Sequence, residues 1–189
     1  MKRYLLVLAL LSLSRPAWTQ SIPLGEIVTD DRSIRDPLYG LTLRYPAGWI
    51  VRGVTRWGDR ETTVYFGAPN SANAFVTLYY RMYTTPGMLP ADPDSFLRTE
   101  AAQKADRRVT GGLADYANVV DSFVSRRVGN LPALNYSARF SAGEKTHVEY
   151  IARVLSQKGT ATFLLRAPLD ELESVREAFD GMVESFRLP

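Results

Sequence analysis

The chain has 189 residues and carries 23 Lys and Arg against 20 Asp and Glu, a formal charge of only +3. Three basic residues, Lys2, Arg3 and Arg15, lie in the first segment, so the remainder balances at 23 − 3 = 20 basic against 20 acidic residues. A balanced charge gives no support for binding to nucleic acid or to an anionic membrane. The absence of cysteine excludes disulfides, thiolate metal sites and a cysteine nucleophile, so the fold must depend on its apolar core.

The segment 1–19 has the construction of a secretory signal peptide. Two basic residues precede an apolar run over residues 4–13, and the small residues Ala17 and Thr19 predict cleavage after Thr19. That run is too short to cross a membrane, and no later stretch supplies the roughly 20 apolar residues that a spanning helix needs. We therefore expect an exported protein, periplasmic or extracellular, with no transmembrane segment in the mature chain.

The mature chain is predicted to begin with a flexible entry segment, 20–36, followed by a single domain, 37–189. The entry segment is polar and shows no sustained periodicity. A mature chain of about 170 residues can bury roughly 70% of its unfolded surface, which is enough for one core without disulfides. Alternating apolar and polar residues then predict strands, with breaks at Pro46 and at the cluster 67–71; these strands are 41–45, the run opening at 49–51, 62–66 and 75–82.

A helix is predicted over residues 93–108, because Asp92 and Pro93 are residue types that begin helices. Four β-rich runs follow, and the turns between them are short enough to join only antiparallel neighbours. The runs are 118–128, 133–141, 146–156 and 160–166. The third run has apolar residues on both faces, so the sheet is predicted to be covered on both sides.

The last predicted element is an amphipathic helix near the end of the chain. Its apolar residues recur at spacings of three, four and seven; they are Leu172, Val175, Phe179, Met182, Val183 and Phe186. Asp170 followed by Glu173 resembles a capping box at its start. We expect this helix to pack on the sheet.

Three local patterns, in this order along the chain, resemble the PsbP-like family. They are the strand, proline and tryptophan opening at 40–49, the hairpin at 129–133 with Tyr136 after it, and the closing helix with Phe179, Met182 and the run Ser185-Phe186-Arg187. The resemblance implies an α+β fold with an antiparallel β-sheet and helices packed on both faces, an α/β/α sandwich. It implies little about activity, because the family has no shared catalytic set. Together with the signal peptide, it favours a bacterial envelope protein.

His147 and Glu149 are the one pair of residues that suggests a metal site or a catalytic site. They lie two apart on a predicted strand, so their side chains share a face, and Glu144 precedes them in a turn. Such nitrogen and oxygen ligands could hold a divalent ion. The favoured interpretation is a polar face with a cross-strand ion pair, because no nucleophile, closed ligand set or cofactor motif accompanies them, and no cofactor is predicted.

Exposed aromatic and arginine residues suggest a binding surface instead. Trp57 lies in a charged, glycine-containing loop, and Arg81 and Tyr83 lie near the end of a predicted strand. These residue types anchor partner surfaces. The preferred hypothesis is a non-catalytic envelope protein that binds a protein partner or a small ligand through these residues. The alternative is an enzyme or metal-dependent protein with a site around His147 and Glu149.

Overall fold

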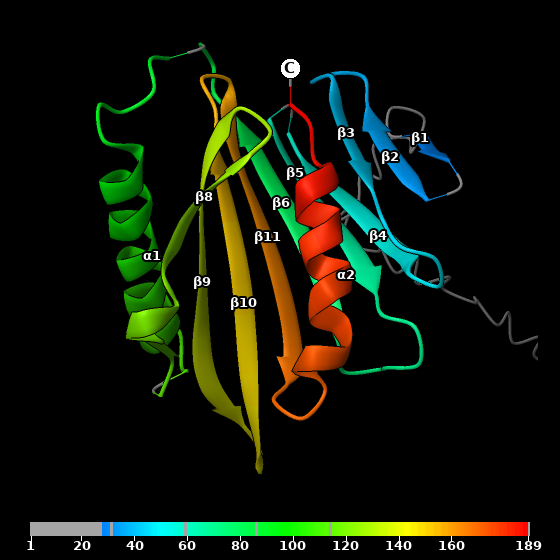
Figure 1. The fold of residues 1–189 in the computed structure, drawn as a ribbon, viewed down its shortest axis with the longest axis vertical. Helices are drawn as coiled ribbons and strands as arrows, with labels where there is room; N and C mark the ends of the chain where they lie inside the picture. The colour runs from blue at the N-terminus through cyan, green and yellow to red at the C-terminus, as the bar shows by residue number, and fades with distance from the viewer. Residues whose placement is uncertain (1–27, 31, 59, 86, 114, 189) are drawn as a thin grey trace, which may run out of the picture.

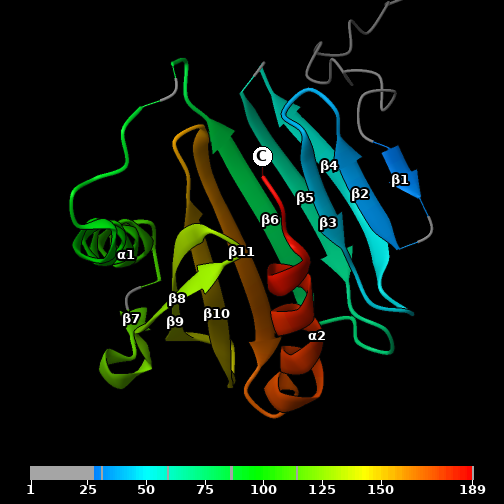
Figure 2. The same ribbon diagram turned by 45° about the horizontal axis from the view of Figure 1, so that its top comes forward.

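The structure, a computed structural model, describes residues 28–188 except positions 31, 59, 86 and 114 (Figures 1 and 2). The predicted signal peptide and most of the predicted entry segment lie outside the described residues. The helices and strands, in chain order, are β1 (Val28–Asp30), β2 (Ser33–Asp36), β3 (Leu41–Arg44), β4 (Ile50–Trp57), β5 (Glu61–Gly67), β6 (Phe75–Met82), α1 (Pro93–Thr110), β7 (Ala117–Asn118), a 3-10 turn (Val120–Ser122), β8 (Val124–Val128), β9 (Leu131–Ala142), β10 (Lys145–Leu155), β11 (Gly159–Pro168) and α2 (Leu172–Ser185). Within the described part of the chain, no helix combines the length and the apolar character needed to cross a membrane.

The strands form two sheets, and every pairing in them is antiparallel. A small sheet has the order β1-β2-β3, and a large sheet has the order β4-β5-β6-β11-β10-β9-β7, with β8 also paired to β9. The predicted meander is present, because β9, β10 and β11 pair in sequence across short turns. The α+β class with a mostly antiparallel sheet is therefore confirmed.

The larger of two apolar cores lies between the large sheet, the small sheet and α2. The helix buries Val175 and Phe179, as its apolar spacing predicts, and the ring of Phe179 lies 5.3 Å from that of Tyr150 on β10. The small sheet adds Ile34 and Leu43, which are fully or almost fully buried. Figure 1 shows α2 lying in front of β11, with β3 close by. This core joins both ends of the described chain to the middle of the large sheet.

The smaller core lies under α1. This helix begins as predicted, since the Asp92 side chain accepts a hydrogen bond from the Ser95 amide at 3.0 Å. Its buried residues, Leu97 and Ala101, pack against β9 and β10. Consecutive residues of β10 belong to different cores: Ile151 lies in the smaller core and Ala152 in the larger one. Successive residues of a strand point to opposite faces, so β10 is packed on both faces.

The C-terminal residues pair with the small sheet. Thr42 on β3 and Arg187 exchange two backbone hydrogen bonds, of 3.0 and 2.9 Å. The Ser185 hydroxyl accepts a hydrogen bond from the Arg44 amide at 2.9 Å, across 141 residues of sequence. The strand β3 and the C-terminal residues are therefore held together by polar contacts as well as by the larger core.

The predicted flexible entry segment is wrong for residues 33–36, which form β2. Ile34 and Asp36 are fully buried. The Asp36 carboxylate accepts hydrogen bonds from Arg56 on β4 at 2.8 Å and from the Tyr80 hydroxyl on β6 at 2.5 Å. These partners are distant in sequence. The pattern of neighbouring residues in this short polar segment therefore could not predict that the large sheet holds it in place.

Two further local predictions are wrong. The predicted capping box of Asp170 and Glu173 is not formed: Glu171 is the N-cap of α2 and makes no side-chain capping bond. The predicted long run 118–128 is divided into β7, the 3-10 turn and β8. The turn is fixed by Ser122, whose hydroxyl accepts a hydrogen bond from the Ser137 amide at 2.9 Å.

Candidate functional site

One face of the large sheet consists of a covered half and an open half. On β9 and β10, α1 packs over this face. On β4, β5 and β6 the same face carries polar and aromatic side chains, which alternate with the residues of the larger core. We define the open half by its residues: Arg52, Thr55, Trp57, Glu61, Thr63, Tyr65, Phe75, Thr77, Tyr79 and Arg81. Both views place α1 at the β9 end of the sheet and β4 toward the other end (Figures 1 and 2).

The prediction that the sheet is covered on both sides is wrong for the open half. Tyr65 is 39% exposed and Trp57 61% exposed, and among the described residues no helix packs over β4, β5 and β6 on this face. The reason is geometric. A helix is about 10 Å wide and strands lie about 4.8 Å apart, so one helix covers only about two strands of a wide sheet.

Trp57 and Arg81, predicted separately as binding residues, lie on one row across the open half. Trp57 is opposite Glu61 on β5, Glu61 is opposite Arg81 on β6, and Arg81 is opposite Thr160 on β11. The Arg81 Nε lies 3.1 Å from the Glu61 carboxylate, and the Arg81 side chain is 62% exposed. The sheet register therefore brings residues from three strands into one exposed aromatic and charged row.

A surface hollow of about 530 Å³ lies at the end of this row. It is lined by residues 60–61 and 81–85, which include the third predicted residue, Tyr83. The Tyr83 amide donates a hydrogen bond to the Lys158 carbonyl at 2.8 Å, which fixes the start of the loop leading to α1. Burial and the nearby Glu100 on α1 raise the pKa of Tyr83. Tyr83 therefore lies where the open half meets the covered half.

The opposite end of the open half carries Arg52. It lies at a bulge in β4, and its guanidinium occupies the space above Gly67: a Cβ on Gly67 would lie 2.0 Å from the Arg52 Nε. Gly67 is opposite Phe75 on β6, and the Arg166 guanidinium lies 5.7 Å from the centre of the Phe75 ring. Arginine side chains therefore lie at both ends of the open half, with aromatic residues and threonines between them.

Glu149 lies in the covered half, in a buried ion cluster. Its side chain is fully buried, and it contacts Lys104 at 3.0 Å and Arg108 at 3.4 Å on α1. It also accepts a hydrogen bond from the Tyr116 hydroxyl at 2.9 Å and pairs with Arg166, directly across from it on β11. This pair is the cross-strand ion pair favoured by the sequence.

The surroundings of Glu149 hold it in the ionised form. Burial alone raises the pKa of this carboxyl, but Lys104, Arg166 and Arg108 outweigh burial and lower the pKa from 4.5 to about 2. Burial and the adjacent Glu149 raise the pKa of the Tyr116 hydroxyl, which keeps its proton and donates it to the carboxylate in a hydrogen bond. Both carboxylate oxygens are thus engaged by cationic or hydroxyl donors, an arrangement that stabilises packing of α1.

His147 lies beside this cluster, and its ring stacks on Phe140 with 5.6 Å between ring centres. Its Nδ1 is buried and has no hydrogen-bond partner. Among the described residues, His147, Glu149 and Glu144 do not form a group of three that could hold a metal ion. The candidate metal ligands therefore share a face, as expected from their spacing, while Glu149 is already held by cations.

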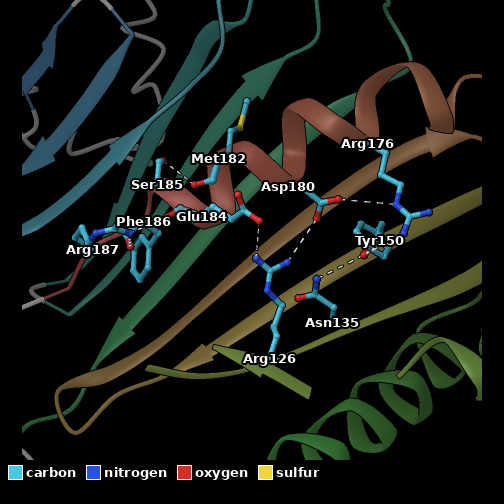
Figure 3. A network of polar contacts seen from close by, with 10 residues as sticks. All are labelled: Arg126, Asn135, Tyr150, Arg176, Asp180, Met182, Glu184, Ser185, Phe186 and Arg187. Atoms are coloured by element: carbon cyan, nitrogen blue, oxygen red, sulfur yellow. Dashed lines mark hydrogen bonds and ion pairs between the residues drawn. The ribbon is translucent and has the colours of Figure 1, made fainter. Parts of the chain in front are cut away.

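A second polar network joins β8 to α2 (Figure 3). Arg126 lies 3.4 Å from Glu184 and 3.8 Å from Asp180, while Arg176 lies 3.9 Å from Asp180. Arg176 also lies over the Tyr150 ring at 4.8 Å. These contacts fasten the β8-β9 hairpin to the helix, so we assign this network to stability rather than to binding.

Tyr65, Tyr79 and Arg52 are parts of the candidate site that the sequence did not predict. The signal for the first two was present, because in β6 the polar or aromatic residues Thr77, Tyr79 and Arg81 alternate with buried apolar residues. Such alternation is typical of a strand with one face toward solvent. Arg52 could not be found in this way, because the bulge in β4 interrupts the alternation there.

No model of a known protein family matches the chain, and no curated protein matches it by sequence. Solved structures do match: the α+β arrangement of a long antiparallel sheet with two helices is shared with several of them. The cyanobacterial PsbP protein CyanoP from Synechocystis aligns with a TM-score of 0.60 and 15% identity, covering 90% of this chain and 97% of that one.

Two other solved structures have a similar fold. LpqN, described as involved in cell envelope biogenesis of Mycobacterium tuberculosis, aligns with a TM-score of 0.50 and 13% identity over 79% of this chain and 83% of that one. A Bacteroides thetaiotaomicron protein aligns with a TM-score of 0.52 and 11% identity over 85% of this chain and 49% of that one. The resemblance to PsbP-like proteins is therefore confirmed as a shared fold.

Proposed function

We propose that this protein is a non-catalytic binding module of the bacterial cell envelope, which holds a protein partner or a small ligand on its open half. The observation that carries the proposal is the exposure of Trp57, Tyr65 and Arg81 on a sheet face that no described helix covers. Trp, Tyr and Arg are the residues that contribute most to binding energy at interfaces. The predicted signal peptide, and the fold shared with the envelope protein LpqN, support the location.

The layered fold suits this role. We propose an α/β/α sandwich in which α2 and the small sheet occupy one face, and α1 only part of the other. A rigid sheet positions side chains more precisely than a loop does, since its strands are held by ladders of hydrogen bonds, on both sides of β5 and β6 and on one side of the edge strand β4. The strongly shifted carboxyl, Glu149, lies under α1 and not in the exposed hollow, which is why binding is favoured over catalysis.

The test compares partners of the purified mature protein with those of a Trp57→Ala, Tyr65→Ala double variant. Each protein is immobilised and exposed to envelope extract and to a panel of small ligands. We expect the double variant to lose the partners or ligands that the native protein retains. Val120→Ala is the matched control, because Val120 is 81% exposed and lies on the 3-10 turn, outside the open half. Unchanged binding by the double variant, or turnover of ester, peptide, glycoside or phosphate substrates, would contradict the proposal.

The alternative, a metal-dependent protein with a site at His147 and Glu149, has one favourable observation: the His147 Nδ1 is buried without a hydrogen-bond partner. Elemental analysis of the purified protein and thermal shifts with divalent ions test this alternative. A metal-induced rise in Tm that His147→Ala abolishes would favour it.

A further inference from the structure

We propose that the open half binds an extended acidic segment of a partner protein, which lies along the strands from Arg52 at one end to Arg81 at the other. This inference rests on the proposed function and specifies the chemistry of the ligand. It depends on three properties of the open half: its size, its charge and its side-chain composition.

The size of the open half selects a segment rather than a folded surface. The face covers three strands, β4 to β6, which at about 4.8 Å per strand give a width of about 14 Å, and its length from Gly67 to Glu61 is about 20 Å. These dimensions give about 300 Å², whereas a stable interface between folded proteins buries about 800 Å² on each partner. An extended chain of about six residues covers 20 Å, so a short segment matches the length of the face.

The charge of the open half selects an acidic segment. Among the described residues of β4, β5 and β6, the charged side chains on this face are two arginines, Arg52 and Arg81, and one carboxylate, Glu61, which pairs with Arg81. Arg52 makes no ion pair with the described residues, and the absence of a side chain on Gly67 leaves room for its guanidinium above the sheet. Arginine binds carboxylates through two parallel hydrogen bonds. Positive groups at both ends therefore favour a segment with acidic residues about five or six positions apart.

The middle of the open half is expected to bind the segment through side chains and not through backbone hydrogen bonds. The backbones of β5 and β6 are paired with neighbouring strands on both sides, so their amide and carbonyl groups are not available to pair with a peptide. What remains accessible is the ring of Tyr65, together with part of the half-buried side chains of Tyr79, Thr55 and Thr77, while Thr63 is buried. Exposed rings of this kind bury apolar surface at little entropic cost, because each has few rotatable bonds. The central residues of the segment are therefore expected to be apolar or aromatic.

The experiment presents random nine-residue peptides on a display library to the immobilised mature protein. Native protein is expected to enrich peptides with acidic residues toward both ends. An enriched peptide is then synthesised and its Kd measured by fluorescence anisotropy. An Arg52→Glu, Arg81→Glu double variant should weaken binding by about tenfold or more, and raised salt should weaken binding to the native protein. Both arginines are exposed, so the double variant is expected to fold, which circular dichroism checks.

Arg139→Glu is the matched control. Arg139 is an exposed arginine on β9, and because its neighbour Ala138 lies in the smaller core under α1, Arg139 points to the opposite face of the sheet from the open half. It should change the Kd less than about twofold. The proposal of an acidic segment would be overturned if the enriched peptides lacked acidic residues, or if the native protein and the arginine double variant had equal Kd values. If Trp57→Ala still abolishes capture of envelope partners, the proposed function stands without it. Binding of polygalacturonate but of no peptide would overturn the protein segment in favour of an anionic polysaccharide.

Discussion

The covered and open halves use the same chemistry on one continuous sheet face, yet they differ in solvent exposure. In the covered half, Glu149 is fully buried and is held by Arg166 and two cations of α1. In the open half, Glu61 pairs with Arg81 while their side chains remain 33% and 62% exposed. The comparison shows that a single helix decides which carboxylate–arginine pair stabilises the fold and which is accessible to a partner.

The two pairs should therefore differ in energy. Removing one member of a buried ion pair leaves an uncompensated charge and costs about 3–5 kcal/mol. An exposed pair contributes at most about 1 kcal/mol, because water screens it.

Glu149→Gln should lower the free energy of unfolding by about 4 kcal/mol, because Lys104 and Arg166 would lose their counter-charge under α1. Glu61→Gln is the matched control in the open half and should change it by less than about 1 kcal/mol. Urea denaturation followed by circular dichroism measures both. Equal effects of the two substitutions would show that the halves do not differ as described.

Tyr136→Ala should cost about 3 kcal/mol, because Tyr136 is fully buried in the smaller core and its removal would leave a cavity. Tyr65→Ala, its counterpart in the open half, should cost less than about 1 kcal/mol. The same denaturation measurement applies. A large cost at Tyr65 would indicate that something covers the open half in the folded protein.

Stability should fall in acid because of Glu149. Its pKa is lowered from 4.5 to about 2 in the folded protein, so its contribution is fully present above pH 4.5 and is lost as the pH falls toward 2. A shift of this size corresponds to at most about 3 kcal/mol. Denaturation midpoints measured across this interval should decline in the native protein and decline less in Glu149→Gln. Parallel curves would contradict the assignment.

Trp57→Ala should change the free energy of unfolding by less than about 0.5 kcal/mol, because Trp57 is 61% exposed at the end of β4. Binding of the envelope partner should nevertheless be lost. Thermal denaturation together with the pull-down separates these effects. A clear loss of stability would mean that Trp57 serves the fold and not the partner.

The elements that follow from local periodicity could be predicted from the sequence. The apolar spacing of α2, the start of α1 at Asp92 and the meander after Gly129 all depend on neighbouring residues. The same local signals placed Trp57 and Arg81 at exposed positions, whereas His147, expected on a polar face, is half-buried with its ring stacked on Phe140. They did not show that Trp57 and Arg81 share a row, because strand register depends on pairing between distant segments.

The predictions that failed concern contacts between distant segments. The apolar residues on both faces of β10 correctly indicated that this strand is packed on both sides, but the prediction extended this to the whole sheet. In β6, buried apolar residues alternate with polar or aromatic ones, which indicates that one face of this strand is exposed to solvent. The buried position of Asp36 could not be anticipated either, because its partners, Arg56 and Tyr80, come from β4 and β6.

The pairing of Thr42 with Arg187 also sets an order of events during synthesis. The small sheet receives its last backbone partner only after Arg187 has been made, and Arg44 waits in the same way for Ser185, 141 residues later. Contacts so distant in sequence form slowly, since a long loop must close first. The small sheet is therefore expected to gain these contacts late in folding, after the segments between Arg44 and Ser185 have formed the large sheet.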